Sequence, residues 1–102
     1  MDKLPLSVVI LTKNEEKNIE RTLQSVRFAD DIVVIDDNSD DNTFKIALDN
    51  GAMVYKRGLD NDFAAQRNYG IEKAKHDWIL YIDADEEVSK ELKQEISNLF
   101  KA

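Results

Sequence analysis

Four short apolar segments, separated by helical patterns, constrain the fold of this chain more than any other feature. They are residues 6–11, 31–36, 52–55 and 78–82. The first two are rich in Val and Ile and show almost no alternation of apolar and polar residues, which is typical of strands covered on both faces of a parallel sheet. Strands that alternate with helices predict right-handed crossovers. We therefore expect an α/β fold with a parallel sheet of about four strands.

Apolar residues at helical spacing fill the intervals between these segments. Ile19, Leu23 and Val26 form one stripe, on a helix that we expect to begin after Asn14 as its N-cap. Three further helices are predicted, over residues 41–49, over residues 62–75 and from residue 89 onward. No repeat or linker interrupts this order. We therefore expect residues 1–102 to form one Rossmann-like unit with helices on both faces of the sheet.

The amino-acid composition excludes several kinds of site. The chain has no Cys, which rules out disulfide scaffolds, thiol catalysis and thiolate zinc sites, and its one His cannot form a histidine metal cluster. No apolar run approaches the roughly 18 residues of a membrane span, and residues 1–5 lack the apolar core of a signal peptide. We therefore expect a protein without a membrane span in a reducing, cytoplasmic setting.

The charge balance narrows the class of ligand. Fourteen Lys and Arg against 21 Asp and Glu give a formal charge of -7. No local basic stripe offsets the repulsion from nucleic-acid phosphates, so we expect no nucleic-acid partner. A phosphorylated small molecule is compatible with this charge, because a divalent cation held by carboxylates can bridge protein and phosphate.

Polar residues follow the ends of the predicted strands, where an open α/β sheet forms its ligand crevice. Asp36 and Asp37 end the second strand, and two adjacent carboxylates repel each other unless one finds a donor or a cation. Asp83 and Asp85 follow the fourth strand. Because residues two apart in extended backbone point to the same side, both can converge on one cation. The tips of these two strands are therefore the candidate site.

Each of these signals also has a purely structural explanation. A chain this rich in Asp gives about 1.6 chance matches to Asp-x-Asp, and residues 60–62 (Asp-Asn-Asp) are a second match that we interpret as a helix entry. Residues 12–16 are as compatible with the capped start of a helix as with a ligand-binding role. Arg67 either extends to solvent or faces the acidic crevice. Asp83 and Asp85 stand directly after a predicted buried strand, which makes them better candidates for a ligand site than residues 60–62.

Four segments together resemble the N-terminal half of inverting family 2 glycosyltransferases with the GT-A fold. They are residues 7–16, 32–43, 65–71 and 77–86, which occur in the order and spacing of the family and cover nearly the whole chain. Within the family, residues 13–16 (Lys-Asn-Glu-Glu) and 28–31 (Phe-Ala-Asp-Asp) are most similar to the bacterial glycosyltransferases that add sugars to the lipopolysaccharide core.

The resemblance implies roles in nucleotide-sugar binding. Thr12 and Asn14 would line the nucleotide pocket, Asp37 would accept a hydrogen bond from the base, and Arg67 would approach the nucleotide. One residue departs from the pattern, because many members place an aromatic residue where Lys13 stands. Lys13 cannot stack on a base, although its ammonium group can approach a phosphate.

The resemblance also implies a metal site. Asp83 would face the ribose and diphosphate, and Asp85 would ligate Mg²⁺ or Mn²⁺ bridging the two phosphates. No catalytic residue is expected in this chain, since the base would lie beyond Ala102, and we interpret Glu86 and Glu87 as solvated loop residues. Residues 1–102 would then be the donor-binding portion, truncated before the acceptor-binding half and inactive or weakly active alone.

The implied reaction is transfer of a sugar from a nucleotide-diphospho-sugar, in the first place a UDP-sugar, to a hydroxyl of a glycan or lipid-linked acceptor. Its setting would be synthesis of lipopolysaccharide or another cell-envelope glycan, with peripheral membrane association or a homodimer through an uncovered sheet edge as further expectations.

Two other classes of function stay open. A phosphoacceptor receiver-type signalling domain needs an acidic pair after the first strand, where this chain has residues 12–14 (Thr-Lys-Asn). A non-catalytic interaction module would tolerate Asn at 37, 83 and 85.

Overall fold

The protein, described by a computed structural model over residues 3–101, alternates strands and helices along its length. Its elements are β1 (Leu4–Thr12), α1 (Ile19–Ser25), β2 (Ala29–Asp36), α2 (Thr43–Asp49), β3 (Met53–Lys56), α3 (Phe63–Lys73), β4 (Ile79–Asp83) and α4 (Lys90–Lys101). All four strands are parallel and form one sheet in the order β3-β2-β1-β4. The predicted α/β fold with a four-stranded parallel sheet is confirmed.

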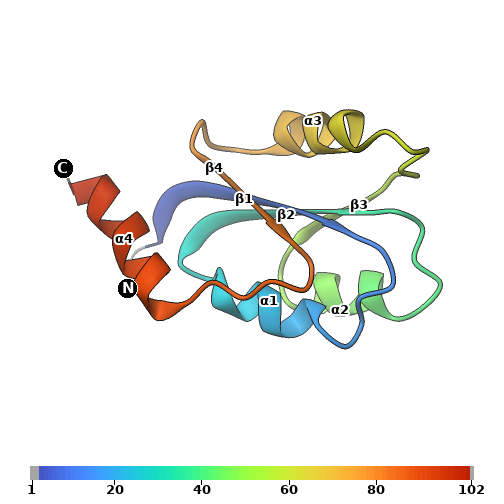
Figure 1. Ribbon diagram of the computed structural model, residues 1–102, viewed down its shortest axis with the longest axis horizontal. Helices are drawn as coiled ribbons and strands as arrows, with labels where there is room; N and C mark the ends of the chain where they lie inside the picture. Colours follow the sequence, from blue (N-terminus) through green and yellow to red (C-terminus); the bar gives the residue numbers. More distant parts are fainter. Residues whose placement is uncertain (1–2, 102) are drawn as a thin grey trace.

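Helices cover both faces of the sheet, as the sequence predicts. Figure 1 shows α3 over one face and α1 and α2 over the other. Below α3 lie Val9, Val33 and Ile35, all fully buried, while the next residues along the same strands, such as Ile10 and Val34, are fully buried on the α1 side. Burial of both faces explains why these strands show no alternation of apolar and polar residues.

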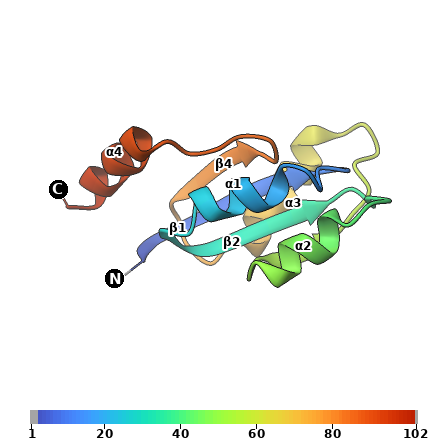
Figure 2. The ribbon, with the colours of Figure 1, turned by 90° about the horizontal axis from the view of Figure 1, so that it is seen from below.

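The last helix, α4, lies to one side of the sheet and contains no buried residue (Figure 2). Two of its apolar residues, Ile96 and Phe100, are partly buried and pack against the core. Leu92 and Leu99 are 40% and 68% exposed. Within residues 3–101, no helix combines the length and the apolar character that crossing a membrane requires.

A glycine allows α3 to lie close to the sheet. A Cβ added to Gly70 would come within 2.6 Å of Val9 Cγ1 and 3.3 Å of Ile35 Cγ1. We expect Gly70→Ala to destabilise the fold by about 1–3 kcal/mol through overpacking, measured by urea denaturation. In a helix without such contacts the same change stabilises by about 0.5–1 kcal/mol. A stabilised Gly70→Ala variant would therefore contradict the close packing of α3 on β1.

The start of α1 differs from the prediction. The helix begins at Ile19, after Asn18, and not after Asn14. Asn14 has a φ of 51° and its Oδ1 accepts a hydrogen bond from the Asp40 amide at 2.8 Å, so it joins two loops instead of capping a helix. This contact spans 26 residues of sequence, which is why local pattern could not reveal it.

A buried carboxylate joins the amino ends of three segments. Asp31 Oδ2 accepts hydrogen bonds from Ser7 Oγ of β1 at 2.7 Å and from the Lys75 amide at 2.8 Å, and Ser7 Oγ accepts one from the His76 amide at 3.0 Å. Asp31 is 8% exposed. We call residues 7, 31, 75 and 76 the amino-edge clamp, because they attach the α3–β4 connection to β1 and β2.

The lone histidine of the chain belongs to this structural edge. His76 Nε2 lies 2.7 Å from Asp30 Oδ2, and Lys75 Nζ lies 3.4 Å from the same oxygen. The hydrogen bond from His76 and the neighbouring Lys75 hold the pKa of Asp30 below its usual value. His76 therefore serves the contact between β2 and the α3–β4 connection.

Candidate functional site

The polar residues that follow the strands meet at the carboxyl edge of the sheet, as expected for parallel strands. Thr12 pairs with Asp36 across β1 and β2, and Leu11 pairs with Asp83 across β1 and β4. A cavity of about 270 Å³ opens beside the tips of β1 and β2. Its walls come from β1, the loops that follow β1, β2 and β3, and the start of α3. They consist of Leu11, Thr12, Lys13, Glu15, Asp37, Leu59, Phe63 and Gln66.

Thr12 lines this cavity and carries a buried hydroxyl. The residue is 5% exposed, and its Oγ1 has no hydrogen-bond partner among residues 3–101. Its backbone oxygen accepts a hydrogen bond from the Asp37 amide at 2.9 Å, which fixes the tip of β2 against the tip of β1. A buried hydroxyl left unsatisfied costs about 1–3 kcal/mol.

The two adjacent carboxylates of β2 have different surroundings. Asp36 is fully buried and accepts hydrogen bonds from both the amide and the hydroxyl of Ser39, at 3.0 and 2.6 Å. Asp37 Oδ1 accepts a hydrogen bond from the Leu59 amide at 2.8 Å, and its Oδ2 lies 3.8 Å from Lys13 Nζ. The repulsion expected between neighbouring carboxylates is thus relieved by separate donors. Asp37 lines the cavity with a side chain that is 20% exposed, and its Oδ2 has Lys13 Nζ as its charged neighbour.

Asn14 supports the site from outside the cavity wall. Its amide donates to Ser39 Oγ at 2.8 Å while its side chain accepts from the Asp40 amide, so the loops after β1 and β2 are joined twice.

Asp41 adds a third contact between these loops, because its Oδ2 accepts a hydrogen bond from the Glu16 amide. Partial desolvation raises the pKa of its carboxyl, but hydrogen bonds from Thr43 and the Glu16 amide outweigh that effect and leave the pKa below the usual range.

Arg67 and Asp83 lie in a second cluster, at the tip of β4. The Arg67 guanidinium is 5.9 Å from the centre of the Tyr81 ring, and both side chains are exposed. Burial and the negative charges of Asp83 and Glu86 raise the pKa of Tyr81, with Arg67 opposing them. Arg67 is thus exposed and lies near the Tyr81 ring of β4, and its approach to a nucleotide stays a prediction.

The structure changes the argument for Asp85. The strand ends at Asp83, and residues 84–85 form a turn, so the alternation rule for extended backbone does not apply to this pair. Both carboxylates are exposed, and the Asp83 amide donates to Glu86 Oε1 at 2.7 Å, which makes Glu86 part of the turn. Within residues 3–101 no three His, Cys, Asp or Glu side chains gather as a metal site.

Three cavity residues were missed by the sequence analysis. Leu59, Phe63 and Gln66 form one wall of the cavity. Gln66 is 1% exposed, and it was included in the segment 65–71 of the sequence without being given a role. Gln66 exchanges two hydrogen bonds with Arg57, which attaches α3 to the end of β3. No signal in the sequence indicated this wall, because Phe63 stands at helical spacing from the buried Gln66 and Gly70 and therefore resembles part of the core-facing stripe.

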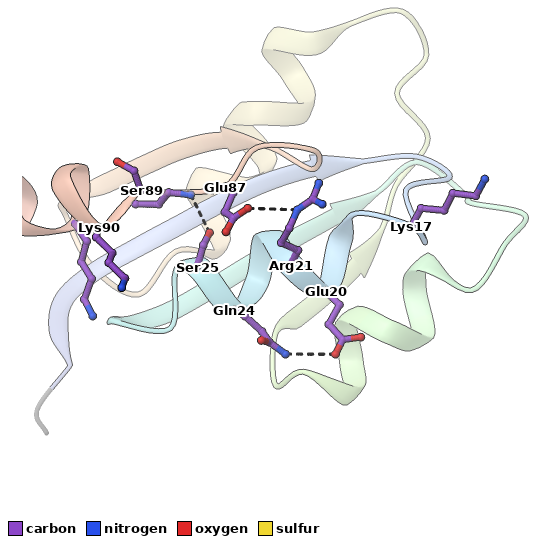
Figure 3. A pocket seen from close by; sticks show the side chains of 10 residues that line it. Lys17, Glu20, Arg21, Gln24, Ser25, Glu87, Ser89 and Lys90 are labelled. Carbon is purple, nitrogen blue, oxygen red and sulfur yellow. Dashed lines mark hydrogen bonds and ion pairs between the residues drawn. The ribbon is translucent and has the colours of Figure 1, made fainter.

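A larger cavity, of about 570 Å³, lies between α1 and the segment leading to α4 (Figure 3). It is lined by exposed side chains of both charges, including an Arg21–Glu87 pair at 3.4 Å, and the Val88 amide donates to Ser25 Oγ at 2.9 Å. Its lining includes none of the residues predicted to bind a ligand. We therefore assign the candidate site to the smaller cavity and the adjoining tip of β4.

The most similar curated proteins include glycosyltransferases. An uncharacterized glycosyltransferase of Rickettsia bellii is 45% identical over 97 residues, which cover 93% of this chain and 32% of that protein. The lipopolysaccharide core biosynthesis glycosyltransferase LpsC of Rhizobium meliloti is 32% identical over 108 residues, covering 98% of this chain and 38% of LpsC. The chain therefore spans about a third of the length of the curated relatives it matches.

Solved structures share the fold. Residues 1–349 of S. aureus TarS, in complex with UDP, superpose with a TM-score of 0.77 at 25% identity, covering 99% of this chain and 32% of that chain. Glucosyl-3-phosphoglycerate synthase of Mycobacterium tuberculosis, with Mn²⁺, UDP and glucosyl-3-phosphoglycerate, superposes with a TM-score of 0.68 at 24% identity, covering 78% of this chain and 33% of that one. These likenesses agree with the GT-A-like arrangement of the sheet and helices.

The sequence profile described as glycosyl transferase family 2 matches residues 7–102, which is nearly the whole of the chain. The same residues contain β2, β3, β4, all of β1 except its first three residues, and the site at the carboxyl ends of the strands. The chain belongs to glycosyl transferase family 2.

Proposed function

We propose that this chain is the donor-binding portion of a glycosyltransferase that uses a UDP-sugar. The observation that carries the proposal is the Asp37 side chain, which is 20% exposed on the wall of the cavity. Thr12, whose hydroxyl has no partner within the described residues, lines the same cavity. Uracil has an N–H that can donate a hydrogen bond to a carboxylate oxygen. The UDP bound to TarS, a structure of the same fold, supports the same ligand class.

The spacing of the strand tips suits a nucleoside diphosphate. Neighbouring strands lie about 4.8 Å apart, so the tips of β2, β1 and β4 together span roughly 10 Å. The base would occupy the cavity beside Asp37 and Thr12. The diphosphate would then extend toward Arg67 and Asp83 at the tip of β4, where the guanidinium can donate to phosphate oxygens.

The residues present fit a Mg²⁺ or Mn²⁺ ion shared with the ligand. Hard divalent cations prefer oxygen ligands, and Mg²⁺ is usually bound by one or two carboxylates together with substrate phosphates and water. Asp83 and Asp85 supply two exposed carboxylates at the tip of β4, which suits such an ion better than a cage made by the protein alone. The ion would stabilise negative charge on the departing diphosphate.

Other parts of the proposal reach beyond the described chain. Similarity to LpsC supports a role in lipopolysaccharide or another envelope glycan, with a glycan or lipid-linked acceptor. We also propose that the acceptor site and the catalytic base belong to the two thirds of the relatives that this chain does not match. The cytoplasmic setting and peripheral membrane association stay predictions, and the comparisons give no support for a homodimer.

A calorimetric titration tests the metal-dependent part of this proposal. We expect UDP to bind at least about tenfold more tightly with Mn²⁺ than without it, because the ion would neutralise phosphate charge near acidic side chains. Asp85→Asn should abolish this gain and leave metal-free UDP binding unchanged. The matched control is Asp60→Asn, which makes the same charge change in the second Asp-x-Asp segment and should retain the gain.

Two outcomes would count against the proposal. If the chain binds no UDP in either condition, the donor-binding role fails and the interaction module becomes the better explanation. If Asp85→Asn keeps the full effect of Mn²⁺, the metal site at β4 is wrong. Uptake of phosphate from acetyl phosphate would instead favour the receiver-type domain.

A further inference from the structure

One aromatic side chain in the cavity wall lacks a packing role in the described fold. Phe63 is 65% exposed, although burying a Phe side chain is worth about 1.5–3 kcal/mol. It belongs to neither of the two core clusters found in residues 3–101, and it lines the cavity beside Asp37. A ring exposed at the wall of a polar cavity is a candidate contact for a ligand.

The position of Phe63 is fixed by its neighbours and not by its own packing. Asp62 caps α3 by accepting a hydrogen bond from the Ala65 amide at 2.9 Å. Asp60 and Asn61, with φ values of 53° and 59°, make the left-handed turn that leads into the helix. Gln66, one turn further on, is hydrogen-bonded to Arg57. The first residue of α3 is therefore held at the cavity by backbone geometry and by two side-chain contacts.

The same cavity places this ring close to the groups that would recognise a base. The Leu59 amide donates to Asp37 Oδ1, so the loop before α3 is attached to the carboxylate proposed to accept from the base. Lys13, on the wall formed by the β1–α1 loop, has its ammonium group directed to Asp37 at 3.8 Å. Phe63 is the one aromatic residue among the cavity residues of the described chain.

We propose that the ring of Phe63 stacks on the pyrimidine base of the donor nucleotide, while Asp37 Oδ2 accepts from the edge of the base. This inference rests on the proposed nucleotide site and assigns the stacking contact to the start of α3. Every base has a π-face, so stacking adds affinity for the base without contributing to phosphate binding.

The test compares two ligands that differ in the base. Phe63→Leu is expected to weaken UDP binding by about five- to a hundredfold in a calorimetric titration with Mg²⁺. Binding of inorganic pyrophosphate with Mg²⁺, which presents no base, should be unchanged. Phe63→Tyr keeps the ring and should keep UDP affinity. Ile71→Ala removes an exposed apolar side chain from the same helix, outside the cavity lining, and should bind UDP as the parent chain does.

The possible failures are distinguishable. If the parent chain binds no UDP, the proposed function itself is wrong. If the parent binds UDP and Phe63→Leu binds it equally well, only the stacking role is wrong. Equal loss of pyrophosphate and UDP binding in Phe63→Leu would show that the residue acts through the shape of the loop, which also overturns the inference. Because Phe63 is largely exposed, these variants are expected to fold.

Discussion

Asp37→Asn is expected to weaken UDP binding by about ten- to a hundredfold while leaving the fold intact. The side-chain oxygen of Asn can still accept the hydrogen bond from the Leu59 amide, so the loop stays attached. The amide nitrogen that replaces Oδ2 can only donate a hydrogen bond. It would face the N–H of uracil, so the two donors would have no acceptor between them. A hydrogen bond to a charged group contributes about 1.5–3 kcal/mol, which corresponds to this loss of affinity.

The matched control for this variant is Asp40→Asn. Asp40 lies in the same loop, its side chain does not line the cavity, and the substitution removes the same charge. We expect Asp40→Asn to bind UDP as the parent chain does and both variants to keep the parent's thermal midpoint. If Asp37→Asn retains full affinity in a parent chain that does bind UDP, the base does not contact Asp37.

Asp31→Ala is expected to cause the largest loss of stability. It removes the acceptor for the buried Ser7 Oγ and for the partly buried Lys75 amide inside the amino-edge clamp. A buried donor without a partner costs about 1–3 kcal/mol. We expect a total loss of about 3 kcal/mol in the free energy of unfolding. Each kcal/mol lowers the thermal midpoint of a domain of this size by about 4–8 °C, so the midpoint should fall by roughly 10–25 °C. Thermal and urea denaturation followed by circular dichroism measure both quantities.

Two neighbouring variants make this prediction specific. Asp31→Asn keeps one acceptor oxygen and should lose less stability than Asp31→Ala. Asp30→Ala removes the adjacent, exposed carboxylate, whose ion pairs with Lys75 and His76 lie at the surface and contribute little. If Asp30→Ala proves as destabilising as Asp31→Ala, the clamp does not depend on the buried carboxylate.

The sheet and the helices could be predicted because burial leaves a direct trace in the sequence. Segments 6–11 and 31–36 contain consecutive Val and Ile because both of their faces are covered. The start of α1 was predicted wrongly, since the side chain of Asn14 contacts Asp40, a residue distant in sequence. Local pattern alone does not distinguish an Asn that caps a helix from an Asn that joins two loops.

The sequence could predict which strands carry the site, but not which side chains contact one another there. The sequence indicated the tips of β2 and β4, yet it could not say which of Asp36 and Asp37 keeps an oxygen for a ligand, because that depends on Ser39 and Leu59. The wall formed by Leu59 and Phe63 depends on two left-handed residues before α3, which sequence pattern does not determine.

The amino-edge clamp and the cavity lie at opposite ends of the same strands, with β1 contributing Ser7 to one and Thr12 to the other. Changes in the loops that face a ligand therefore leave the buried carboxylate of the clamp and its partners untouched. Such a separation lets substrate preference drift, in evolution or in the laboratory, without each change first requiring a compensating gain in foldability. Loop-randomised libraries that keep Ser39, the donor to the buried Asp36, would consequently retain a large fraction of folded members.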